Sequence, residues 1–101
     1  MTAPENHTLF MQALSLESPP RNWSQPLRAL WYDANGDWES AHNIAQDLHT
    51  PMGSWIHAYL HRKEGDDWNA GYWYRRAGRS FFQASLEDEF NALVKAGIAS
   101  G

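Results

Sequence analysis

Two histidines and a glutamate lie close together in the segment HAYLHRKEG. His57, His61 and Glu64 are separated by four and three residues, so on a helix their side chains would share one face. Two imidazoles and a carboxylate one turn apart could supply two or three ligands to a metal ion. The chain contains no cysteine, so such a site would have only nitrogen and oxygen ligands. The alternative is a pair of partly exposed histidines hydrogen-bonded to nearby carboxylates, because His-x-x-x-His spacing often occurs without a metal.

A cluster of aromatic and basic side chains follows in GDDWNAGYWYRRAG, residues 65–78. If this segment packs against the helix that carries the histidines, Tyr72 and Arg75 would line the groove between the two helices. Arginine forms bidentate hydrogen bonds with carboxylates and phosphates, and aromatic rings offer a flat wall. The alternative is that the arginines only offset the dipole of their helix and pair with surface carboxylates. The predicted site for a small anionic ligand consists of His57, His61, Glu64, Tyr72 and Arg75, with His57 and His61 as the metal ligands.

Other polar residues have simpler explanations. His42 and His49 are seven residues apart on one predicted helix face, and we expect them at the surface or at an interface. Asp33 and Asp37 flank a turn, where capping of a helix accounts for them. The motifs of a serine nucleophile, a phosphate-binding loop and a dinucleotide-binding loop do not occur in the sequence. The sequence therefore identifies no reaction and requires no cofactor.

The elements that would position these residues are helices. The chain contains one valine and no alternating run of Val, Ile or Thr, which argues against strands. Thr50 followed by Pro51 predicts the start of a helix and Gly65 its end, and the next helix would run from Asp66 or Asp67 to Gly78. The same rules predict an N-terminal helix at about residues 5–17 and a C-terminal helix at about 85–96, which stops at Gly97.

An internal repeat of 29 residues occupies the middle of the chain. Units at about 26–49 and 52–78 both have the pattern of a helix, a Gly-Asp turn and a second helix. Helical-hairpin arrays have such repeats, because each unit buries its apolar face on its neighbour. The aligned pairs are Gly36 and Gly65, Asp37 and Asp66, and Ala41 and Ala70.

The repeat resembles known families. YDANGDWESA resembles the turn between the helices of a tetratricopeptide repeat, and DDWNAGYWYRRAG resembles the second helix of the Sel-like repeat. The segments HAYLHRKEGD and YWYRRAGR also resemble a family of small uncharacterised microbial proteins. The repeat resemblance covers about residues 27–78 and implies an all-α fold, a short right-handed array of two antiparallel hairpins with capping helices at both ends. The positions that match the Sel-like consensus are Asp66, Ala70, Trp73, Tyr74, Arg75, Arg76 and Ala77.

The composition limits the partners. A chain of 101 residues with a net charge of −4 forms one domain and offers no general attraction to nucleic acid. It has neither a signal-peptide pattern nor an apolar run long enough for a membrane span, so we expect a cytoplasmic protein with no membrane partner. Because helical repeats mostly act as scaffolds, the favoured function is an interaction module that binds a protein partner or itself. The alternative is a protein, catalytic or not, that binds a metal or a small anionic ligand.

Overall fold

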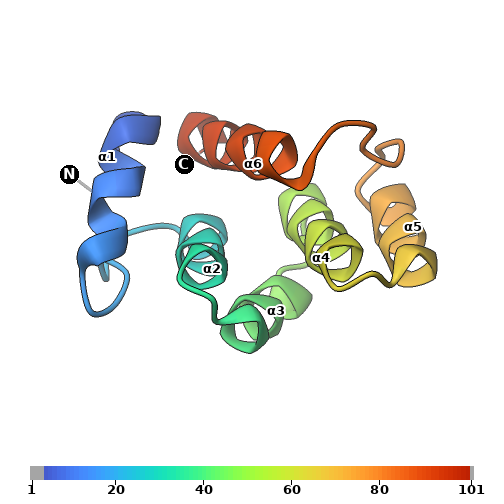
Figure 1. Ribbon diagram of the computed structural model, residues 1–101, viewed down its shortest axis with the longest axis horizontal. Helices are drawn as coiled ribbons and strands as arrows, with labels where there is room; N and C mark the ends of the chain where they lie inside the picture. The colour runs from blue at the N-terminus through green and yellow to red at the C-terminus, as the bar shows by residue number, and fades with distance from the viewer. Residues whose placement is uncertain (1–3, 101) are drawn as a thin grey trace.

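The computed structural model describes residues 4–100, and these residues form helices and no strands (Figure 1). The prediction of an all-α fold is confirmed. None of the helices among the described residues is both long and apolar enough to cross a lipid bilayer. The elements are α1 (His7–Gln12), a 3-10 turn (Ala13–Ser15), α2 (Gln25–Ala34), α3 (Trp38–Asp47), α4 (Pro51–Lys63), α5 (Asp67–Arg76) and α6 (Leu86–Ser100).

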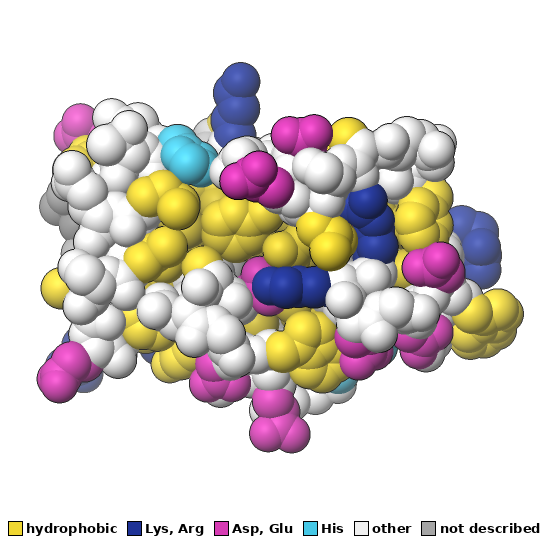
Figure 2. All heavy atoms as spheres, viewed as in Figure 1, with side chains coloured by type: hydrophobic (Ala, Val, Ile, Leu, Met, Phe, Trp, Pro, Cys, Tyr) yellow, Lys and Arg dark blue, Asp and Glu magenta, His cyan; other side chains and the backbone are white. Residues whose placement is uncertain are grey.

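The middle helices pack in chain order, α2 on α3, α3 on α4, and α4 on α5. Helix α6 lies across α2 and α4, and α1 packs against α6 (Figure 1). Figure 2 shows hydrophobic side chains gathered along the middle of this face. The sequence predicted capping helices at the two ends of the array, but α6 instead covers the inner helices. The outer face of α5 is left open, and Trp68 on it is 77% exposed.

The two hairpin turns follow from local chemistry. Gly36 and Gly65 have φ angles of +83° and +87°, in the left-handed region that glycine adopts most easily. Each is followed by an aspartate, Asp37 or Asp66, whose side chain accepts a hydrogen bond from the backbone N–H three residues later. This is the bond that satisfies a free N–H at the start of a helix. Both turns were predicted from the sequence, as was the cap at Thr50, which accepts a hydrogen bond from the backbone N–H of Gly53.

The prediction that the last helix stops at Gly97 is wrong, because α6 continues to Ser100. Gly97 is buried, and a Cβ added to it would lie 2.9 Å from Cδ2 of Leu27. The glycine therefore allows α6 to approach α2 closely and does not end the helix. Local rules cannot distinguish these two uses of glycine.

Two buried carboxylates join helices that are far apart in the sequence. Glu89 on α6 is fully buried and accepts hydrogen bonds from Nε1 of Trp55 at 3.0 Å, from Nη1 of Arg62 at 2.7 Å and from the hydroxyl of Tyr74. Burial and the nearby carboxylate raise the pKa of Tyr74, so its hydroxyl remains a donor. Because these three donors lie on α4 and α5, Glu89 fixes α6 to the second hairpin.

The second carboxylate is Asp33, which the sequence placed at a turn as a capping residue. That prediction is wrong, since Asp33 is only 3% exposed. Its side chain accepts hydrogen bonds from the hydroxyl of Tyr59 at 3.1 Å and from Nζ of Lys63 at 3.0 Å. Both donors belong to α4, so Asp33 joins α2 to α4 across the interior.

The apolar core combines aromatic rings with small residues at the helix crossings. Ala41 and Ala70, the aligned alanines of the repeat, are both fully buried. Small side chains at these positions allow the helices of each hairpin to approach closely. The largest apolar side chains of the core are Phe10, Trp23, Leu27, Leu30, Trp31, Trp55, Ile56, Tyr59, Leu60, Tyr74, Leu93 and Val94.

Candidate metal centre

Three histidines meet where α3 packs on α4. His42 comes from α3, and His57 and His61 come from successive turns of α4. One ring nitrogen of each lies within 4.8 Å of a ring nitrogen of the other two. The ring centroids are 4.5 Å apart for His42 and His57, 5.3 Å for His42 and His61, and 4.9 Å for His57 and His61. We refer to these three residues as the three-histidine cluster.

His57 is the most buried member of the cluster. It is 4% exposed, and its Nδ1 atom is buried without a hydrogen-bond partner. The sequence treated the His57 and His61 pair as separate from the packing of the fold, which is incorrect for His57. Because nearly all buried polar atoms in proteins have a partner, the unpaired Nδ1 of His57 is the nitrogen of the group that most needs one.

Two indole rings hold the cluster from either side. Trp73 of α5 stacks on His57 with a centroid separation of 3.9 Å, and Trp38 of α3 stacks on His42 at 4.8 Å. Nε1 of Trp38 donates a hydrogen bond of 2.9 Å to the backbone carbonyl of Leu60, which fixes that ring. The imidazoles therefore occupy a restricted, partly dry space formed by three helices.

The surroundings favour neutral imidazoles. Burial, together with the neighbouring His42 and His61, lowers the pKa of His57 to about 4. Burial also lowers the pKa of His42, with a contribution from His61 that Glu64 partly offsets. A histidine must be neutral to give its lone pair to a metal. These two residues are thus in the ligand state at neutral pH.

Glu64 orients the third histidine. Its Oε1 atom lies 2.8 Å from Nδ1 of His61, and since a carboxylate can only accept, Nδ1 carries the proton. In the neutral ring, the Nε2 atom of His61 then holds the lone pair. A carboxylate behind a metal-binding histidine commonly has this role. His61, Glu64 and Asp66 form a second close group of possible ligands, but Asp66 is already engaged as the cap of α5.

The structure brings together three of the five predicted site residues, His57, His61 and Glu64. Tyr72 is 38% exposed. Its ring lies edge-on to the ring of Trp73, with the centroids 5.2 Å apart, so Trp73 separates it from the cluster. Arg75 is exposed on α5, and no hydrogen bond joins it to a histidine among the described residues. Its neighbour Arg76 lies over the ring of Trp73 at 5.2 Å.

The sequence interpretation missed His42, which it placed at the surface or an interface. A signal for it existed in the repeat, because the second helix of one hairpin packs against the first helix of the next. His42 lies on such a second helix and His57 on the following first helix. His49, in the α3–α4 connection, is exposed as expected and lies outside the cluster.

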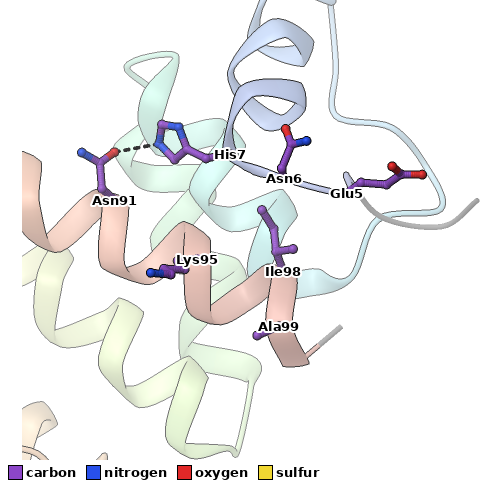
Figure 3. Close-up of a pocket in the computed structure, with 7 residues that line it drawn as sticks. All are labelled: Glu5, Asn6, His7, Asn91, Lys95, Ile98 and Ala99. Carbon is purple, nitrogen blue, oxygen red and sulfur yellow. Dashed lines mark hydrogen bonds between the residues drawn. The ribbon is translucent and has the colours of Figure 1, made fainter.

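A pocket at another place has a different character. It has a volume of about 620 Å³ and lies between the start of α1 and the end of α6. Figure 3 shows the hydrogen bond of 2.8 Å between His7 and Asn91 at its edge, and the side chains of Glu5 and Lys95 pointing away from each other. Because its charged groups do not converge, we do not assign a reaction or a metal to it.

Comparisons with protein families, with curated proteins and with solved structures find no match for this chain. Its function must therefore be inferred from the geometry of its side chains.

Proposed function

We propose that the protein binds a divalent transition metal at the three-histidine cluster. The observation that supports this most directly is the convergence of His42, His57 and His61 within 4.8 Å, with one buried nitrogen of His57 unpaired. Three histidines and one open position are a common arrangement for zinc. Because zinc–nitrogen bonds are about 2.0–2.1 Å long, small side-chain rotations would complete the site.

The ligand set favours some metals over others. Imidazole nitrogen suits Zn²⁺, Cu²⁺ and Ni²⁺, whereas Mg²⁺ and Ca²⁺ prefer oxygen ligands. The chain has no cysteine, so thiolates do not contribute. We therefore expect Zn²⁺ to bind in preference to Mg²⁺, with affinity that falls as the pH is lowered and the histidines gain protons.

The test is calorimetric titration of the metal-free protein with Zn²⁺. We expect one ion per chain, and we expect His42→Gln and His61→Gln each to weaken binding strongly. Glu64→Gln should weaken it about 10–100-fold, as is typical for the partner of a ligand histidine. These variants keep a side chain of similar size, whereas truncation of His57 would also remove packing against Trp73.

Two histidines outside the cluster provide matched controls. His7→Gln and His49→Gln remove imidazoles that are exposed and do not belong to the cluster. We expect both variants to bind Zn²⁺ as the wild type does. Equal losses in controls and cluster variants, or no binding by the wild type, would rule out the proposed site.

A second candidate function is protein–protein interaction through the outer face of α5. Trp68 is 77% exposed and Tyr72 is 38% exposed, and the two lie one turn apart. Exposed aromatic side chains in a patch are typical of interaction surfaces, and a protein partner or a second copy could cover them. Self-association is tested by measuring the molar mass across a range of concentrations, with Trp68→Ser expected to abolish it. Leu16→Ser, at an exposed apolar residue between the 3-10 turn and α2, should leave it unchanged.

A further inference from the structure

A pocket of about 300 Å³ lies beside the three-histidine cluster, where α4 begins. Helices α4 and α5 lie at both this pocket and the three-histidine cluster. Ser54 lines the pocket and precedes His57 by three residues on α4. Trp73 lines the pocket and also stacks on His57. The last turn of α3 and the residues after it, Gln46 and His49, close the other side.

The lining of this pocket contains no carboxylate, although the chain as a whole has a net charge of −4. Its polar groups include the guanidinium of Arg76 and the imidazole of His49. Arg76 lies over the ring of Trp73 and donates a hydrogen bond of 3.3 Å to the hydroxyl of Tyr72. It makes no ion pair with a described residue, so its remaining N–H groups are free for an anion.

The start of α4 adds to the positive potential. Thr50 and Pro51, at the beginning of this helix of 13 residues, also line the pocket. The N-terminal end of a helix carries a partial positive charge from its aligned peptide dipoles. An anion in the pocket would therefore meet this helix end and the guanidinium of Arg76 together.

Ser54 adds a hydrogen-bond donor to the pocket. The residue is only 8% exposed, and its hydroxyl makes no hydrogen bond with a described residue. It lies in the wall of the pocket, where a bound molecule can reach it. Because no described residue occupies it, this hydroxyl is available to donate a hydrogen bond to a molecule in the pocket.

We infer that this pocket binds the oxyanion group of a small molecule, a carboxylate or a phosphate. Arg76 supplies the charge and paired N–H donors, Ser54 donates one hydrogen bond, and the start of α4 contributes its dipole. Stacking on Trp73 holds the guanidinium in place before the anion arrives. The inference does not depend on a metal at the three-histidine cluster, because none of these three groups belongs to it.

The test is an NMR titration of the metal-free full chain, with inorganic phosphate in one series and acetate in the other, at constant ionic strength. We expect saturable shifts of the Ser54 amide and of the Trp73 indole N–H. Saturation by phosphate alone would identify a phosphate group, and saturation by acetate alone a carboxylate. Shifts that grow linearly for both anions, or no shifts, would overturn the inference.

Substitution of two neighbouring arginines distinguishes a specific anion site from a general attraction of anions to positive charge. Arg76→Gln should weaken binding by about tenfold or more, since it removes a charge-assisted hydrogen bond. Arg75→Gln removes the same charge from the same helix outside the pocket and should leave the affinity unchanged. Ser54→Ala should weaken binding severalfold. Equal effects of the two arginine changes would contradict the inference, and Arg76→Lys, which keeps the charge without the planar group, should bind with intermediate affinity.

Discussion

The two hairpins of this protein have the same turns and different chemistry. In both, the aspartate N–H after the turn glycine donates a hydrogen bond of 2.9 Å to a carbonyl of the preceding helix. With the offset of 29 residues, that carbonyl belongs to Tyr32 in the first hairpin and His61 in the second. The same offset aligns Arg28 with His57. The repeat therefore preserves the backbone of the turn, while the side chains at these two positions of the first helix differ.

The aligned positions share one further property. Nε of Arg28 and Nδ1 of His57 are both buried and lack hydrogen-bond partners. Only the second hairpin has a preceding hairpin, whose helix α3 contributes His42. The first is preceded by α1 and a 3-10 turn, which provide no histidine at this place. His57 is a candidate metal ligand because an imidazole has a lone pair, which a guanidinium lacks, and because α3 brings His42 to it.

The largest expected effect is a difference in stability between matching substitutions on the second helices of the two hairpins. Trp73 aligns with Ile44, and both side chains are partly buried. Trp73→Ala should reduce the free energy of unfolding by about 3 kcal/mol, because it removes a large ring and exposes His57. Ile44→Ala should cost less, about 1–2 kcal/mol, since fewer contacts are lost. Urea denaturation measures both, and a smaller loss for Trp73→Ala would show that this ring does not support the second hairpin.

The next effect concerns pH in the metal-free protein. Since the pKa of His57 is about 4 in the folded chain and about 6.5 when unfolded, its contribution to stability is complete above pH 6.5. It is lost as the pH falls towards 4, because the unfolded state binds the proton more readily. The free energy of unfolding should fall by about 2 kcal/mol more in the wild type than in His57→Phe between pH 7 and pH 4.5.

The first hairpin provides the control for this pH effect. The guanidinium of Arg28 does not titrate in this range, so Arg28→Met should change stability without changing its dependence on pH. Equal slopes for the wild type and His57→Phe would show that His57 is readily protonated in the folded chain.

The smallest expected effect tests whether the two hairpin turns contribute equally to stability. Gly36→Ala and Gly65→Ala should each cost about 1 kcal/mol, because an L-residue is strained at positive φ. No atom lies within 4 Å of a Cβ added at either position, so the backbone alone determines the cost. Thermal unfolding should show similar losses for the two variants. Clearly unequal losses would mean that the two turns differ in their surroundings.

Local chemistry made several features predictable. The caps at Thr50, Asp37 and Asp66 depend on hydrogen bonds between residues three positions apart. Positive φ at Gly36 and Gly65 depends on one residue each. For the same reason the sequence could place His57, His61 and Glu64 on one helix face. The likeness to tetratricopeptide and Sel-like repeats stays a prediction, since an all-α fold permits other arrangements.

The sequence by itself determined where the hairpin helices begin and end, because capping and turn formation involve neighbours along the chain. Only the tertiary structure decided which polar side chains meet. His42 reaches His57 across 15 residues, and Trp55 reaches Glu89 across 34. It also decided that Gly97 serves close packing against Leu27 and that Asp33 is buried beside Tyr59. Such pairings depend on how helices pack, and helix packing is set by the whole apolar core and by no single local pattern.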